Sequence, residues 1–389
     1  MVELTANSKS NNPLAPVIGL SFFAIASGFL MSLIPLSLNA FNINIDLAPW
    51  LASVFYLGLL IGALCIERVV VKIGHRLAFI GFLALLIISV IAQLISPTAT
   101  MWLIARFVAG MAVAGVFVVV ESWLLMANTA KARAKRLGLY MTSLYGGSAV
   151  GQLAIKPLGT TDAVPYLFVI TLLAVAILAP LLITRGQPDT QNLQKLPFKE
   201  LKTLNRPAIL GCLVSGLLLG PIYGLLPVYI AAQTEQAQYT GLLMAVIILG
   251  GMLVQPLVSY LSTRIIKSLL MAIFCFIGTA SVVGVLHANS FAALVSSYFI
   301  LGACSFALYP IAITLACDSL PMAKIVSATE IMLLSYSVGS VLGPLMATYF
   351  SDKSHGVLIY LGGCLITTCI YMLIKSMKKI PTGNTPVAG

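Results

Sequence analysis

Long apolar runs divide almost the whole chain, and short breaks rich in charged residues, Pro, Gly or Asn separate them. A helix needs about 20 apolar residues to cross the hydrocarbon core of a bilayer. Read between the breaks, the pattern predicts twelve membrane-spanning helices. We expect them near residues 16–38, 48–66, 77–95, 100–126, 137–157, 163–184, 207–230, 238–262, 268–287, 291–317, 325–350 and 355–375.

Composition agrees with this pattern. The 389 residues are 60% hydrophobic and only 8% charged, whereas a soluble domain carries about 25% charged residues. Such a chain cannot cover a water-facing surface, so we expect an all-α membrane protein in contact with the lipid bilayer. The net charge of +11 does not indicate nucleic-acid binding, because the basic residues are spread over the short connections instead of forming one patch.

The chain also divides into two similar halves. Its longest polar stretch covers residues 185–206, and we interpret it as a cytoplasmic linker between six-helix bundles at 1–184 and 207–389. Glycines recur 192 residues apart in the pairs Gly110/Gly302, Gly147/Gly339 and Gly151/Gly343. A repeat in the same direction predicts two pseudo-symmetric bundles with a substrate cavity between them near the membrane midplane. This geometry favours transport by rocking one half against the other.

Basic residues predict the orientation. All but three of the 22 Lys and Arg residues lie in alternate connections, in the linker or near the termini. The exceptions are Lys156 and Lys353 in the opposite connections and Arg106 inside a span. Cytoplasmic loops carry the excess of Lys and Arg. We therefore expect a multi-pass protein of the bacterial inner membrane with both termini in the cytoplasm.

Ionisable residues inside spans are costly, and each is a functional candidate. Arg106 and Glu121 lie in the fourth span and Glu330 in the eleventh, and we interpret all three as proton-coupling residues. Each has an alternative role. Arg106 would bond to carbonyls of a neighbouring span, Glu121 would pair with Arg68 or the basic loop at 131–136, and Glu330 would stabilise a helix N-terminus.

Small residues form a second group. Gly138, Gly147 and Gly151 on the fifth span, and Gly339, Gly343 and Pro344 on the eleventh, are spaced by about four residues or multiples of four. This spacing favours close helix packing. We expect these faces to lie where the two halves move against each other.

Polar and aromatic residues within the spans are candidates for the cavity wall. The seventh span is repeatedly broken by Gly and Pro, which indicates a bendable helix whose freed carbonyls face a cavity or other protein. The candidate lining residues are Trp123, Tyr140, Tyr145, Gln152, Tyr223 and Tyr309.

Catalytic and metal-binding patterns are missing from the sequence. The three His residues lie in connections or at span ends, the seven Cys residues lack ligand spacing, and no phosphate-cradling loop is present. We therefore expect no enzyme activity, cofactor or metal, and an ion gradient or the substrate's own gradient as the energy source. An enzyme would need convergent catalytic residues, and a receptor a large soluble domain.

Several segments resemble the major facilitator superfamily, and within it the YcaD-like group. The loop Gly62–Phe79 (GALCIERVVVKIGHRLAF) is similar to that group's version of the superfamily loop signature. Arg106–Gly110 (RFVAG) resembles the fourth-span motif whose arginine assists proton coupling. ESWL at 121–124 and LGLYM at 137–141 are the most group-specific segments, and LGGMLVQP at 249–256, YPIA at 309–312 and VLGP at 341–344 extend the likeness. The fifth-span glycines match the antiporter motif, although Gln152 replaces its proline.

The resemblance implies an alternating-access secondary carrier that moves a small organic molecule, coupled to protons, as a monomer, with export favoured. It also implies a cytoplasmic gate formed by Gly62, Glu67, Arg68, Gly74 and Arg76. The alternative is proton-coupled uptake of a sugar, a metabolite or a siderophore. Substrate identity does not follow from the resemblance.

Overall fold

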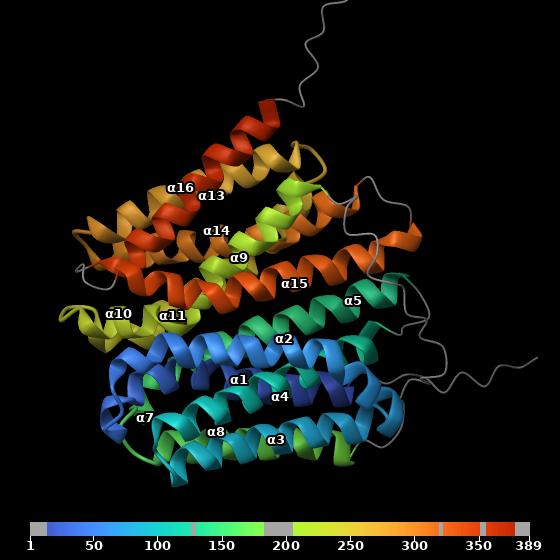
Figure 1. Cartoon of the computed structure of the whole chain (residues 1–389), viewed down its shortest axis with the longest axis vertical. Coiled ribbons are helices and arrows are strands. Elements are labelled where there is room, and N and C mark those ends of the chain that lie inside the picture. Colours follow the sequence, from blue (N-terminus) through green and yellow to red (C-terminus); the bar gives the residue numbers. More distant parts are fainter. Residues whose placement is uncertain (1–13, 126–129, 183–204, 319–321, 351–354, 378–389) are drawn as a thin grey trace, which may run out of the picture.

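The computed structural model describes residues 14–125, 130–182, 205–318, 322–350 and 355–377, and within these ranges it is helical (Figure 1). The helices of the N-terminal half are α1 (Leu14–Ser37), α2 (Ala48–Ile73), α3 (His75–Ile95), α4 (Ala99–Leu125), α5 (Ala130–Met141), α6 (Gly147–Leu153), α7 (Ile155–Leu158) and α8 (Val164–Leu182). Those of the C-terminal half are α9 (Arg206–Gly224), α10 (Leu226–Ala232), α11 (Thr240–Leu253), α12 (Gln255–Leu261), α13 (Lys267–Leu286), α14 (Phe291–Cys317), α15 (Met322–Ala347) and α16 (Gly356–Met377). The predicted linker lies outside the described residues, except for its last two.

Among the described residues, 11 helices are long and apolar enough to cross a membrane. The predicted fifth span is not among them. It runs as α5, a π-helical turn over Thr142–Gly146, α6 and α7. The predicted seventh and eighth spans are likewise broken, at Leu225 and Val254, next to Pro227 and Pro256. The twelve predicted passages and the all-α membrane fold thus correspond to the observed helices.

Glycines hold equivalent helices together in both halves. A Cβ on Gly151 of α6 would overlap the backbone of Ile25 in α1, and one on Gly343 of α15 would meet the Leu217 carbonyl of α9 at 2.7 Å. Gly110 of α4 lies in the same way against the backbone of α2, and Gly302 of α14 against α11. The repeat of 192 residues is therefore a repeat of helix contacts. Because each contact lies within one half, these glycines do not form the surface between the halves, contrary to the sequence interpretation.

Gly138 departs from that pattern. A Cβ built on it would meet nothing within 4 Å. Its place in α5 is therefore not a close-packed face, although its spacing to Gly147 and Gly151 suggested one. Pro344 does belong to a tight contact, since its ring lies 3.0 Å from where a Cβ of Gly220 would be.

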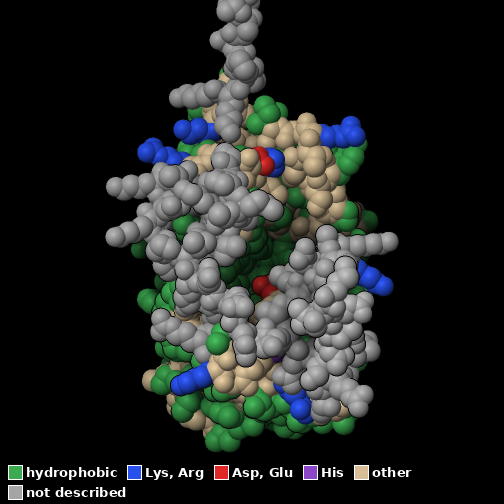
Figure 2. All heavy atoms as spheres, turned by 90° about the vertical axis from the view of Figure 1, so that its right-hand side faces the viewer, with side chains coloured by type: hydrophobic (Ala, Val, Ile, Leu, Met, Phe, Trp, Pro, Cys, Tyr) green, Lys and Arg blue, Asp and Glu red, His purple; other side chains and the backbone are tan. Residues whose placement is uncertain are grey.

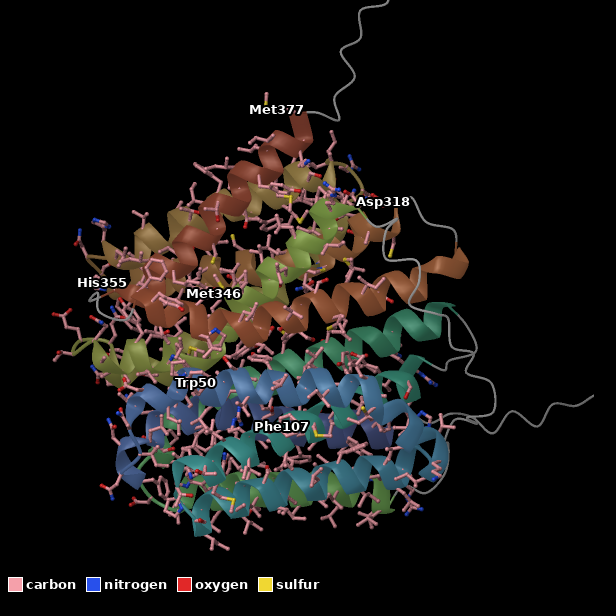
Figure 3. All side chains as sticks on the ribbon, viewed as in Figure 1. Trp50, Phe107, Asp318, Met346, His355 and Met377 are labelled. Carbon is pink, nitrogen blue, oxygen red and sulfur yellow. The ribbon has the colours of Figure 1, made fainter. Side chains whose placement is uncertain are left out.

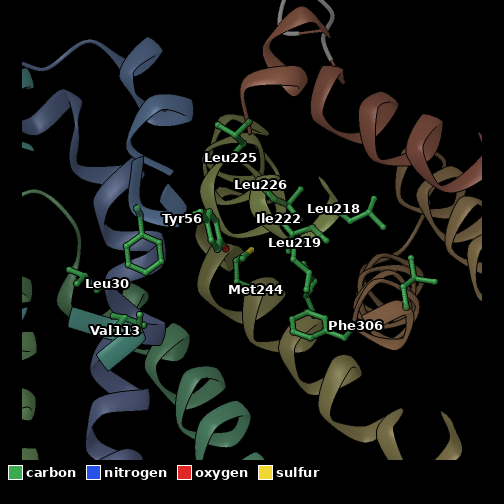
Figure 4. Packing of buried hydrophobic residues seen from close by; sticks show 14 of the residues in the cluster. Leu30, Tyr56, Val113, Leu218, Leu219, Ile222, Leu225, Leu226, Met244 and Phe306 are labelled. Atoms are coloured by element: carbon green, nitrogen blue, oxygen red, sulfur yellow. The ribbon is translucent and has the colours of Figure 1, made fainter. Parts of the chain in front are cut away.

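The halves lie one above the other in Figure 1 and meet along α2 with α9 and α15, α6 with α11, and α1 with α10. Figure 4 shows Tyr56 of α2 beside Ile222 of α9 and Met244 of α11. Buried apolar residues from both halves form one continuous cluster here. Large apolar side chains on the outside, such as Ile88, Phe276 and Ile370, are exposed, as expected where lipid is the solvent.

Charged residues differ between the two ends of the bundle. The basic end, as we call it, carries Lys72, Arg76, Lys135, Arg136, Arg206, Arg264, Lys267 and Lys375. The opposite end carries Asp46, Lys156, Asp162 and Glu235. Figure 3 shows these two ends in the C-terminal half, with Asp318 at one and His355 at the other. Asp318 pairs with Lys267 at 2.6 Å.

Candidate functional site

A hollow opens on the basic end between the two halves (Figure 2). Glu121 lies near the end of α4, and its side chain is exposed although it belongs to a membrane-spanning helix. The hydroxyl of Tyr140 on α5 donates a hydrogen bond to Glu121 Oε1 at 2.8 Å. The structure thus brings two of the predicted residues together and gives the carboxylate access to water.

The π-helical turn follows Tyr140 directly and carries Tyr145. Such turns are often found at functional sites, because the wider turn redirects side chains. The Tyr145 ring packs edge-on against Phe306 of α14, with ring centroids 5.6 Å apart, and Tyr223 of α9 packs against the same ring at 6.1 Å. These contacts join the two halves through aromatic side chains.

Two further tyrosines of the C-terminal half lie next to this group. Tyr309 on α14 and Tyr336 on α15 have ring centroids 5.1 Å apart. Tyr309 and Tyr336 both lie near Tyr145, and Tyr336 also lies near Tyr223. We call Tyr145, Tyr223, Phe306, Tyr309 and Tyr336 the aromatic cluster. Phe306 and Tyr336 are not among the sequence candidates.

Arg106 lies on α4, fifteen residues before Glu121, and only 5% of it is exposed. Its guanidinium stacks over Phe55 at 4.3 Å, and its Nε has no hydrogen-bond partner among the described residues. It faces a narrow cavity between the halves, whose wall includes Tyr56 of α2 and Tyr223 of α9. The helical rise separates Arg106 from Glu121 by about 22 Å along α4.

Closure at the opposite end comes from contacts between the halves. A Cβ on Gly224 of α9 would overlap Ala52 of α2, and one on Gly241 of α11 would overlap the Gln152 carbonyl. The ammonium of Lys156 lies over the Tyr239 ring at 5.8 Å. The molecule is therefore closed at this end and open at the basic end.

Two of the residues predicted to line the substrate cavity, Gln152 and Trp123, do not line a cavity between the halves. Gln152 is fully buried, accepts a hydrogen bond from Ser32 at 2.7 Å and donates one to the Gly28 carbonyl at 2.6 Å. Trp123 is fully buried and packs edge-on against His75. Both side chains belong to the packing of the N-terminal half, which corrects the sequence interpretation.

The described gate residues contact their own half. Arg76 donates hydrogen bonds to the carbonyls of Pro180 and Leu181, at 2.6 and 3.0 Å, and so caps the end of α8. Gly74 has a φ of +82°, which glycine adopts without strain, and it allows α3 to follow α2 directly. Gly62 lies close to Ala114 of α4. The side chains of Glu67, Arg68 and Glu330 lie outside the described residues.

Comparisons with known proteins agree with this architecture. The family model described as the Major Facilitator Superfamily matches residues 17–344. An MFS-type transporter of Enterobacter sp. (strain 638) is 30% identical over 376 residues, covering 95% of this chain and 96% of the relative. The MFS-type transporter YcaD of Escherichia coli O6:K15:H31 (strain 536 / UPEC) is also 30% identical over 376 residues, covering 95% of both chains.

Solved structures share the fold. The crystal structure of the nucleoside transporter NupG is 12% identical, with a TM-score of 0.74 over 94% of this chain and 98% of that one. The E. coli fucose:proton symporter FucP is 15% identical, with a TM-score of 0.62 over 93% of this chain and 98% of that one. At these identities the likeness concerns the fold alone.

Proposed function

Because the chain belongs to the major facilitator superfamily, we propose that it is a proton-coupled carrier that moves a small organic molecule across the bacterial inner membrane by alternating access. The observation that carries this proposal is the asymmetry of the interface between the halves. The halves touch at the opposite end and leave a hollow at the basic end. Rocking the halves would reverse this arrangement and expose the same cavity to the other side. The relatives' names are those of transporters, which favours a carrier over an enzyme or a receptor.

The basic end is the cytoplasmic end in this proposal. Lys and Arg gather there, and the positive-inside bias places such connections in the cytoplasm. The first and last described helices, α1 and α16, begin and end at that face, so both termini would be cytoplasmic. The structure then corresponds to an inward-open state. The α2–α3 connection with Gly74 and Arg76 would approach the C-terminal half when the cytoplasmic side closes.

Glu121 is the proton-binding group in this proposal. Its side chain is exposed at the end of α4 and accepts a hydrogen bond from Tyr140. Closing the hollow over an ionised carboxylate would bury a charge, which is costly. Protonation of Glu121 would remove that cost, so the change between states would depend on the proton. Glu330 remains a second predicted proton site on α15.

The substrate would contact the aromatic cluster, in which Tyr145, Tyr223 and Tyr309 come from both halves. Binding between the halves allows a substrate to act on their relative position. Export remains the expected direction, and uptake of a sugar, metabolite or siderophore is the alternative.

The test begins with a metabolite comparison between cells that lack and cells that overproduce the protein. The metabolite that changes is then followed in proteoliposomes of known orientation, with and without a pH gradient. We expect accumulation that requires the gradient, and the side of accumulation gives the direction.

Glu121→Gln should abolish the response to the gradient but preserve exchange of labelled for unlabelled substrate. Glu235→Gln is the matched control, because this exposed carboxylate lies at the opposite end. A Glu121→Gln carrier that responds to the gradient like the wild type would refute the assignment. Equal accumulation without any gradient in the wild type would refute proton coupling.

A further inference from the structure

Arg106 has a buried positive charge that the described protein does not balance. Its Nε is buried without a hydrogen-bond partner, and the ionisable groups that act on it are the phenols of Tyr56 and Tyr166. No carboxylate among the described residues pairs with it. The contact with the Phe55 face is favourable, but an aromatic ring carries no net charge. A buried charge without a partner is costly, and buried charges in proteins are ordinarily paired.

The cavity beside Arg106 lies between the halves, where a transported molecule would sit. Tyr223 and Gly224 of the C-terminal half line it together with Phe55 and Tyr56 of the N-terminal half. Its remaining wall is apolar and includes Met31 and Ile34. The cavity is narrow in this conformation, so a ligand that enters it must be small. A ligand that fits this wall has a compact apolar body.

From this arrangement we infer that Arg106 binds the carboxylate of the substrate, and that the substrate is a small monocarboxylate with an apolar body. A guanidinium presents paired N–H donors that match a carboxylate in geometry and charge. One positive charge balances one negative charge, and the lining contains no second charged side chain. A dianion such as a phosphate monoester would therefore leave a charge unbalanced in the cavity. This inference rests on the proposed function, because it names the class of molecule carried.

The role differs from proton coupling by Arg106. A guanidinium keeps its proton and cannot itself release one. Arg106 also lies about 22 Å along α4 from Glu121. Arg106 would hold the substrate, and Glu121 would bind the proton.

The experiment measures thermal stabilisation of the purified full-length protein in detergent. The probe is sodium benzoate, and the matched neutral probe is benzamide with sodium chloride at the same ionic strength. Phenyl phosphate serves as the dianionic probe. We expect benzoate to raise the unfolding temperature in a saturable manner, with little effect of benzamide, chloride or phenyl phosphate.

Arg106→Gln should weaken benzoate binding at least about tenfold, because charge-assisted hydrogen bonds are lost. Arg106→Lys should weaken it less, because it keeps the charge. Arg264→Gln is the matched control: this exposed arginine also stacks on an aromatic ring, Tyr260, at 4.8 Å, but lies at the basic end. Its benzoate affinity should equal that of the wild type.

Three outcomes would overturn the inference. The first is equal stabilisation by benzamide or chloride, the second is unchanged benzoate affinity in Arg106→Gln, and the third is the absence of any benzoate effect. The wild-type comparison of benzoate with benzamide decides the matter even if Arg106→Gln does not fold. Failure here would leave pH-driven transport in proteoliposomes intact. Failure of the proposed function would instead appear as benzoate binding without pH-driven transport.

Discussion

Replacing Gly151 with alanine should loosen the N-terminal half, whereas the same change at Gly138, on the same membrane passage, should not. Gly151 lies in α6 against the backbone of α1, where a Cβ would overlap Ile25 and lie 2.8 Å from the Phe29 nitrogen. At Gly138 a Cβ would meet nothing within 4 Å. Both residues belong to the fifth passage and receive the same methyl group. Only the packing of the helix differs.

The two substitutions share one favourable effect. Alanine is better than glycine in a helix by about 1 kcal/mol, because it loses less backbone freedom. At Gly151 the methyl group also forces two backbones apart, and overpacking of this kind costs about 1–3 kcal/mol. The neighbour here is backbone, which cannot rotate away, so we take the upper end of that range. Gly151→Ala should then destabilise the protein by about 2 kcal/mol, and Gly138→Ala should stabilise it by up to about 1 kcal/mol.

The measurement is the apparent unfolding temperature of each variant in the same detergent and at the same scan rate. A fixed rate matters because large proteins commonly unfold irreversibly. At about 2 °C per kcal/mol for a long chain, Gly151→Ala should lower the temperature by about 4 °C. Gly343→Ala, the equivalent change in the C-terminal half, should lower it similarly, since its Cβ would lie 2.7 Å from the Leu217 carbonyl.

Equal shifts for Gly151→Ala and Gly138→Ala would refute the reasoning, because a helix-propensity effect alone would then explain both. A loss of stability at Gly138→Ala would show that α5 is packed there after all. The stability of these glycine contacts matters for the proposed transport cycle. Halves that rock as units require helices that stay together within each half, and these glycines lie inside the halves rather than between them.

Two further predictions concern the proton site and the orientation. Tyr140→Phe removes the hydroxyl that donates to Glu121, so pH-driven transport should fall by up to about tenfold. Tyr360→Phe is the control, because that hydroxyl donates to the Leu217 carbonyl within the C-terminal half, and an equal loss in both variants would contradict the prediction. The orientation is tested by thiol labelling in a background in which the exposed Cys65 is replaced by serine. A membrane-impermeant thiol reagent should label Lys375→Cys only from the cytoplasm and Glu235→Cys only from the periplasm. The reverse pattern would overturn the proposed orientation.

Hydropathy predicts the membrane passages because lipid imposes one condition on every span. Each passage must be apolar over a fixed length, and its backbone must be hydrogen-bonded internally. A hydropathy pattern does not show where the helix within a passage departs from regular α-helical geometry. The residue types of the π-helical turn at Thr142–Gly146 also occur in regular helical turns, so composition does not reveal it. Helix ends also differ from hydrophobic ends: α5 begins at Ala130, since Lys and Arg in the basic loop are good helix formers.

The site was harder to predict, because residue type does not show which way a side chain points. Gln152 is polar and lies in a span, yet its hydrogen bonds with Ser32 and Gly28 are made inside one half. Phe306 is ordinary in an apolar helix, and only the fold places it between Tyr145 and Tyr223. Tyr56, like Tyr223, is a phenol within an apolar run, and this pattern alone marks it as a candidate for the cavity wall.

The separation of Arg106 from Glu121 implies an order of charge compensation in the proposed cycle. Arg106 is already buried in this conformation, so its charge is balanced only when the monocarboxylate is bound. Glu121 lies in the open compartment, so its charge is tolerated until the hollow closes. Closure with both ligands present would bury no net charge, whereas closure with either one missing would bury a charge without a partner. Proton and anion would therefore move together in the same direction, so an inward proton gradient would drive the uptake alternative, and export would require an outward gradient of the anion itself. Glu121→Gln removes one of the two conditions, and its exchange of substrate should lose its dependence on pH.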